Sequence, residues 1–165
     1  MTPTGEGATA VTELQGRRAE EGDAAGIAAL LPALGYAAAL PDVRDRLGRL
    51  LRTRHAAVFV AQSVGGIVGL CHVSGVVNLA TGGYAEVLEL VVASPSRSRG
   101  VGRALVSQAS EWARDAGFRR LRLRSGVHRG DAHAFYERLG FARSSASHAF
   151  EAALEPPLHA SGDPR

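Results

Sequence analysis

The chain has 165 residues, of which 45% are hydrophobic and 21% are charged, and its formal net charge at pH 7 is +3. This composition excludes a disordered chain, and the lack of an apolar run of about 20 residues excludes a membrane-spanning helix. The single cysteine, Cys71, excludes an internal disulfide and a multi-cysteine zinc site. Since the first residues lack the basic and apolar regions of a signal peptide, we expect one cytoplasmic domain over residues 10–155 with flexible tails at 1–9 and 156–165.

The first part of this domain predicts one strand followed by two helices. A short strand is expected over residues 11–17. Asp23 is a candidate N-cap for the next segment, in which apolar residues recur at helical spacing. Pro41 opens a second helix because proline is favoured in a first turn, and apolar residues again recur on one face.

The middle of the chain predicts three antiparallel strands. Two apolar runs, 57–62 and 67–76, are joined by a turn at Gly65 and Gly66, which is typical of a β-hairpin. A polar loop then returns the chain into a third apolar run over 84–93. Because consecutive hairpins place neighbouring strands in opposite directions, this part of the sheet is expected to be antiparallel.

The last part predicts helix, strand, helix and strand. The helical period is strong from Gly100 to Gly117, and residues 119–127 alternate leucine with arginine as a strand does. Another helix is expected over 131–139 and a last strand over about 142–154. The predicted order, βααβββαβαβ, is that of an α+β domain with a central mixed, mostly antiparallel sheet flanked by helices.

Positive charge is concentrated between Arg97 and Arg124. This stretch holds eight arginines and two acidic residues, which gives it a net charge of +6, whereas the remainder of the chain carries −3. Such a local positive field suits a polyanionic ligand, either a phosphorylated cofactor or nucleic acid. The arginines lack the interleaved aromatic residues of a single-strand-binding surface, so the sequence favours the cofactor.

A loop of Ser, Pro, Arg and Gly joins the third strand of the middle group to the long helix. A helix N-terminus presents unpaired N–H groups and a partial positive charge, and Gly100 and Gly102 let this backbone come close to a ligand. Arg97, Arg99 or Arg103 supplies further charge. We therefore expect a phosphate-binding site at this junction. Neither the P-loop pattern, which needs a lysine, nor the GxGxxG pattern fits the sequence.

Two motifs resemble those of the GNAT family of N-acetyltransferases. The run Arg97-x-x-Gly100-x-Gly102-x-Ala104 resembles the pyrophosphate loop of that family. The run AHAFYERLGF at 132–141 resembles its A-x-x-F-Y-x-x-x-G-F signature, one strand and one helix further along the chain. The order of strands and helices also fits that family, so the resemblance covers about residues 10–155.

The resemblance implies the GNAT fold, in which strands 4 and 5 are parallel and splay apart around acetyl-CoA, the cosubstrate, without a metal. Carried over to this chain, main-chain groups of Leu90, Val91 and Val92 line the pantetheine. Tyr136 is implied to lie near the thioester sulfur. The amides implied to hold the pyrophosphate are those of Arg97, Ser98, Arg99, Gly100, Val101, Gly102, Arg103 and Ala104.

Acetylation of a primary amine requires the loss of a proton, which a carboxylate can accept with a gain of roughly 10²- to 10⁴-fold. Glu89 is the candidate catalytic base and Glu86 the second. The two lie on opposite faces of a regular strand, whereas a bulge would shift the alternation. Tyr136 is the candidate catalytic acid because a phenol can donate a proton or a hydrogen bond to a departing thiolate.

The sequence therefore predicts an acyltransferase that uses acetyl-CoA to acetylate a primary amine of a small molecule or peptide, by direct attack in a ternary complex. The alternative is a CoA-binding or CoA-sensing protein of the same fold that does not catalyse. We expect no nucleic acid, membrane or metal ligand, and a homodimer is left open. Cys71 is interpreted as a buried core residue and His72 as structural.

Overall fold

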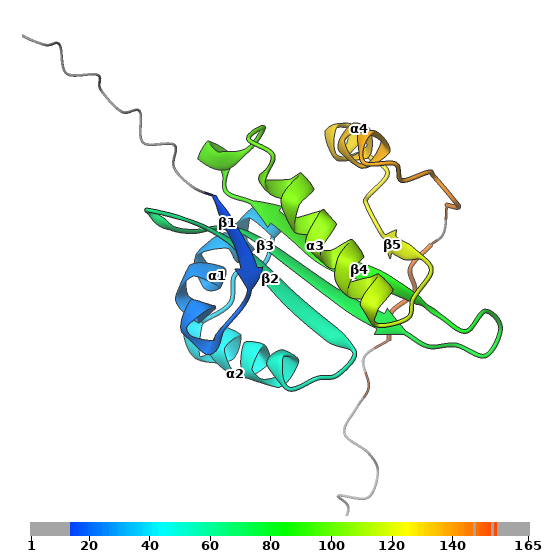
Figure 1. Cartoon of the computed structure of the whole chain (residues 1–165), viewed down its shortest axis with the longest axis horizontal. Coiled ribbons are helices and arrows are strands. Elements are labelled where there is room, and N and C mark those ends of the chain that lie inside the picture. The colour runs from blue at the N-terminus through cyan, green and yellow to red at the C-terminus, as the bar shows by residue number, and fades with distance from the viewer. Residues whose placement is uncertain (1–13, 147, 153, 155–165) are drawn as a thin grey trace, which may run out of the picture. The chain divides into compact units, whose positions relative to one another are not determined.

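The structure is a computed structural model that describes residues 14–146, 148–152 and 154. The chain divides into two compact units between His128 and Arg129. The first unit contains a five-stranded sheet with helices packed on both of its faces (Figure 1). The second unit contains the helix α4 (Gly130–Arg138).

The sheet has the strand order β1-β2-β3-β4-β5. All neighbouring strands are antiparallel except β4 and β5, which are parallel. This arrangement confirms the predicted mixed, mostly antiparallel sheet with parallel fourth and fifth strands. The strands are β1 (Gln15–Arg18), β2 (Ala56–Ser63), β3 (Gly66–Val76), β4 (Tyr84–Val92) and β5 (Leu121–Leu123).

Two separate apolar clusters fix the helices to the two faces of the sheet. On one face α1 (Ala24–Leu30) and α2 (Leu40–Leu51) pack against strand residues such as Val60. On the other face α3 (Val101–Asp115) buries Leu105 against the strands. Three short 3₁₀ turns, Glu21–Asp23, Leu31–Leu34 and Ser94–Ser96, complete the first unit.

Gly69 of β3 lets α3 lie close to the sheet. A Cβ atom at this position would come within 2.9 Å of Leu105 Cδ1 and of Val101 Cγ1. Such a contact is shorter than packed carbon atoms allow, so a larger residue here would push the helix outward. The start of α3 is therefore held directly against the strand that neighbours β4.

An irregularity in β4 decides which of its side chains share a face. His72 of β3 pairs with Glu89, and the next residue, Val73, pairs with Val87, so Leu88 is an extra residue in β4. Such a bulge shifts the alternation of side chains by one position. Glu86 and Glu89 consequently lie on the same face, the one covered by α1 and α2. Of the two arrangements that the sequence left open, a regular strand and a bulged one, the structure therefore has the bulged one.

The prediction of a last strand over about residues 142–154 is wrong. The described residues of that segment form no strand, and all of them are exposed. The segment is rich in Ala and Ser, whose side chains bury little apolar surface. That burial is too small to offset the entropy lost when a backbone is ordered.

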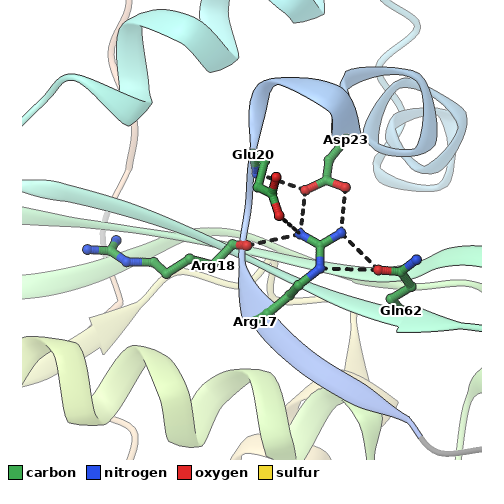
Figure 2. Close-up of polar contacts among 5 residues, drawn as sticks. All are labelled: Arg17, Arg18, Glu20, Asp23 and Gln62. Carbon is green, nitrogen blue, oxygen red and sulfur yellow. Dashed lines mark hydrogen bonds and ion pairs between the residues drawn. The ribbon is translucent and has the colours of Figure 1, made fainter.

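A partly buried cluster around Arg17 ties β1 to the turn before α1 (Figure 2). Arg17 Nη1 and Nη2 donate to the two carboxylate oxygens of Asp23 at 2.7 and 2.8 Å, and Arg17 Nε donates to Gln62 Oε1 of β2 at 3.1 Å. The Glu20 amide also donates to Asp23, at 2.8 Å. Asp23 occupies the N-cap position of α1, as predicted, but its side chain pairs with Arg17 and forms no capping hydrogen bond to the helix. The hydrogen bond from Arg17 lowers the pKa of the Asp23 carboxyl, against the opposing effect of burial.

We predict that Asp23→Asn lowers the free energy of unfolding by about 1–3 kcal/mol at pH 7, because the variant removes the partly buried carboxylate charge that pairs with Arg17. Since the folded pKa of Asp23 is lowered, its stabilising effect is present above about pH 4 and is lost as pH falls through the folded value. Urea unfolding between pH 7 and pH 2 should show a smaller pH dependence in the variant. Asp45→Asn is the control, because its ion pair with Arg49 is exposed. Equal losses of unfolding free energy in the two variants would contradict a stabilising role of the Arg17–Asp23 pair.

Candidate functional site

The edge of β4 that faces β5 is paired over only a short stretch. The described pairing joins Ala85–Val87 to Leu121–Leu123, whereas β4 continues to Val92. Leu88–Val92 therefore extend past the end of β5. A strand edge without a partner presents peptide N–H and C=O groups that an extended, amide-containing ligand can bind. The residues predicted to line pantetheine, Leu90, Val91 and Val92, lie on this stretch.

The loop between β4 and α3 contains two residues in the left-handed region, Ser98 with φ 60° and Gly100 with φ 81°. Position 100 suits glycine because an L side chain is strained at such a φ. A Cβ atom built at Gly100 would meet no heavy atom within 4 Å, so the space in front of this peptide is open. The loop thus places an open stretch of backbone at the start of α3.

The first turn of α3 supplies hydrogen-bond donors. The N–H groups of Val101, Gly102 and Arg103 have no acceptor within the helix, and the N-terminus is the positive end of the helix dipole. The Ala104 amide donates to Gly100 O at 3.0 Å and the Arg97 amide to Ser94 O at 3.3 Å. These two predicted anion-binding amides are therefore already engaged, and the candidate anion site narrows to the amides of residues 98–103.

The arginines of the loop fall into two groups. Arg97 Nε donates to Val92 O at 3.2 Å, so this side chain covers the end of β4. Arg99 and Arg103 are exposed, and within the described parts of the chain their guanidinium groups form no hydrogen bond or ion pair. These two side chains are the ones that remain available to an anion at the helix start.

The two carboxylates of β4 have different surroundings. Glu86 is buried and accepts a hydrogen bond from Arg124 Nε at 3.1 Å. Glu89 is partly exposed, with 43% of its side chain accessible, and its Oε2 lies 3.1 Å from His72 Nδ1. Because Glu86 is held by a guanidinium, whereas Glu89 is held by an imidazole and remains accessible, Glu89 is the carboxylate better placed to accept a proton.

We assign the proton of His72 to Nδ1. An ionised carboxylate can only accept a hydrogen bond, so the short contact with Glu89 requires a donor. His72 Nε2 is buried and has no hydrogen-bond partner among the described residues, which suits a bare lone pair better than a second N–H. His72 thus acts as a neutral donor that fixes one oxygen of Glu89. Sequence reasoning missed this contact, because the pairing of positions 72 and 89 depends on the bulge at Leu88.

A cavity of about 150 Å³ lies between the sheet and the helices α1 and α2. Glu89 and His72 form part of its wall, and the other polar side chain that lines it is Arg46 of α2. The remaining wall is aliphatic and comes from α1, α2 and the adjoining turn, and from β2 and β3. In the sequence alone, the apolar residues that line this cavity have the helical and strand spacing of ordinary core residues.

Cys71 is fully buried on the opposite face of β3 from His72. Burial raises the pKa of its thiol to about 12, and the negative charge of Glu89 acts in the same direction. Because the thiolate is the nucleophilic form, this thiol is inert at neutral pH. The interpretation of Cys71 as a core residue is consistent with both observations.

Tyr136 belongs to the second unit. It lies on α4, where its ring centroid is 5.3 Å from that of Phe135 and 6.1 Å from that of Phe141. The three rings form a small aromatic cluster at the end of the helix, with Tyr136 half-buried. The motif at 132–141 therefore folds as the predicted helix and the turn at Gly140.

No group of three or more His, Cys, Asp or Glu side chains among the described residues is arranged to hold a metal ion. None of the described helices is both long and apolar enough to cross a lipid bilayer.

Comparison with protein families and curated sequences gives a consistent result. The model of the acetyltransferase (GNAT) family matches residues 23–141. The uncharacterized N-acetyltransferase YhdJ of Bacillus subtilis is 35% identical over 98 residues, which are 59% of this chain and 69% of that protein. Three further curated relatives are matched over 42%, 38% and 52% of their own lengths.

Solved structures show the same fold. A transcriptional regulator from Bacillus halodurans superposes with a TM-score of 0.75 at 25% identity, covering 85% of this chain and 100% of that chain. The aminoglycoside N-acetyltransferase AAC(6')-Iy, solved in complex with CoA, superposes with a TM-score of 0.79 at 16% identity, covering 93% of this chain and 100% of that chain. The second likeness is one of fold alone.

Proposed function

The chain belongs to the GNAT family of acetyltransferases, and from that premise we propose that it transfers the acetyl group of acetyl-CoA to a primary amine of a small molecule or peptide. The observation that carries the proposal is the course of β4. Its edge beyond Val87 lacks a described partner strand, and the chain then turns at Gly100 into the donors of the α3 N-terminus. A ligand with an extended amide-containing arm followed by a pyrophosphate fits this order of features.

The described residues fit acetyl-CoA in their chemistry. Leu90, Val91 and Val92 line the pantetheine along the free edge of β4, where Arg97 Nε already donates to Val92 O. The amides of residues 98–103 bind the pyrophosphate, which can approach because the space in front of Gly100 is open. Arg99 and Arg103 add positive charge. Acetyl-CoA supplies the thioester whose acetyl group is transferred.

Glu89 acts as the general base. It accepts a proton from the amine nitrogen at a carboxylate oxygen, while His72 Nδ1–H holds Oε2 in place. Three features support Glu89 over Glu86: its partial exposure, its place in the wall of the cavity, and the engagement of Glu86 by Arg124. The bulge at Leu88 contributes by turning Glu89 toward that cavity.

The acetyl group moves by direct attack of the amine in a ternary complex. A route through an acyl-cysteine is disfavoured because Cys71 is buried and the pKa of its thiol is raised to about 12. Tyr136 donates from its phenol oxygen to the departing thiolate, the role that the motif at 132–141 implies.

We predict that Gly100→Glu weakens acetyl-CoA binding by about 10²-fold or more, because a side chain and a negative charge then stand where the pyrophosphate approaches. Calorimetric titration measures the affinity. Gly117→Glu is the matched control: Gly117 follows the other end of α3, has φ 87°, and likewise has open space at its Cβ position. Both variants carry similar backbone strain, so equal affinities in the two would refute the site.

We predict that Glu89→Gln lowers kcat by about 10²-fold or more with little change in acetyl-CoA affinity, because the amide cannot accept the proton. The deficit should shrink as pH rises, since more of the amine is then already neutral. Release of the CoA thiol with a panel of primary amines measures turnover. Glu86→Gln is the control, and comparable losses in both variants would contradict the choice of Glu89. Acetyl-CoA binding without thiol release from any amine would instead indicate the non-catalytic CoA-binding protein.

We predict that Tyr136→Phe lowers kcat at least about tenfold while acetyl-CoA affinity changes by less than about twofold, because only the proton donor is lost. Tyr84→Phe is the control, since the Tyr84 ring packs under Arg122 and keeps that contact without its hydroxyl. An equal loss of turnover and cofactor affinity in Tyr136→Phe would leave Tyr136 a packing role only.

A further inference from the structure

The wall of the cavity beside Glu89 is unlike a surface built for polycations. Most of its lining is aliphatic, including Ile27 of α1, Leu47 and Leu50 of α2, and Leu70 of β3. Aliphatic walls favour a ligand that carries an apolar group, because burial of that group removes it from water.

The polar groups of the cavity gather around one carboxylate. His72 donates Nδ1–H to Glu89 Oε2 and is assigned as neutral, so it adds no charge of its own. Glu89 can therefore hold one ammonium or amine group, with its orientation fixed by His72. Cys71, the other titratable group next to Glu89, faces the opposite cluster and stays a neutral thiol.

Arg46 sets the charge at the solvent side of this wall. It is exposed, it lines the cavity, and within the described residues its guanidinium has no ion-pair partner. With Glu89 negative and Arg46 positive, the charges that line the cavity cancel. A second cation on the ligand would therefore meet a guanidinium instead of a carboxylate.

From these contacts we infer that the acceptor is a compact monoamine with an apolar body, its nitrogen at Glu89 and its body in the aliphatic cavity. This inference rests on the proposed function and names the substrate class of the same site. The cavity volume of about 150 Å³ lies below the roughly 300–1,000 Å³ of usual ligand pockets, which favours a short aliphatic body over a large polycyclic one.

The test compares 1-aminopentane with 1,5-diaminopentane, two substrates of the same length that differ by one ammonium group. Thiol release from acetyl-CoA by the full chain gives kcat/KM for each, and calorimetry gives the affinity of each amine. We expect a preference of at least about tenfold for 1-aminopentane. In the series from aminoethane to aminopentane, kcat/KM should rise about fourfold for each methylene group, and then level off for longer chains.

Three variants connect the preference to the cavity. Leu50→Phe should lower kcat/KM for 1-aminopentane about tenfold, because it fills space that the body would occupy. Leu51→Phe is the matched control on the same helix, since Leu51 is exposed and does not line the cavity. Arg46→Glu should raise kcat/KM for 1,5-diaminopentane relative to 1-aminopentane by about tenfold.

The outcomes separate this inference from the proposed function. Equal or better use of 1,5-diaminopentane or of an aminoglycoside by the unaltered chain would overturn the substrate class and leave the acetyltransferase activity standing. Failure to bind acetyl-CoA, or binding without thiol release from any amine, would overturn the proposed function and the inference with it. Because the amine comparison uses the unaltered chain, it decides the question even where a variant fails to fold.

Discussion

The extra residue at Leu88 is the constraint on which the site depends. A strand has a period of two, so Glu86 and Glu89 would face opposite sides of a regular β4. The bulge brings both to the face of α1 and α2 and aligns Glu89 with His72 of β3. It also lies where the described pairing of β4 with β5 has just ended. One local insertion thus coincides with the free edge of β4 and turns a carboxylate toward the cavity.

The two faces of the sheet differ in how completely they are packed. The helix α3 packs closely on one face of the sheet. Gly69 permits a close approach of the helix, and Leu105 is fully buried against the strands. This tight packing fixes the helix start, whose amides the proposed function uses for the pyrophosphate. Around α1 and α2 the packing is incomplete, because a cavity remains between them and the sheet. The tightly packed face therefore carries the proposed cosubstrate site, and the incompletely filled face carries the proposed acceptor cavity.

Much of the fold was predictable because its signals are local. The hairpins, the parallel pairing of β4 with β5 and the helical period of α3 all follow from periodicity, turn residues or the resemblance to the family. The bulge could only be left open as an alternative to a regular strand, since residues 84–93 contain no glycine or proline to mark its position. Asp23 occupies the N-cap position of α1 as predicted, but its carboxylate bonds Arg17 on another element and not the amides of the helix. The last expected strand failed because a tertiary requirement, burial of one face, was not met there.

The net charge of the arginine-rich stretch does not show which of its arginines can reach a ligand. The sequence assigns +6 to the stretch from Arg97 to Arg124, but three of its guanidinium groups are directed at this chain: Arg97 contacts Val92 O, Arg122 covers Tyr84, and Arg124 pairs with Glu86. A guanidinium that is hydrogen-bonded or stacked in place has less freedom to reach a ligand, although its charge still contributes to the field. The direct contacts to a pyrophosphate are therefore proposed to come from backbone amides and from the exposed Arg99 and Arg103. Arg97, Arg122 and Arg124 instead contact β4, one of the two strands between which the cosubstrate is proposed to lie.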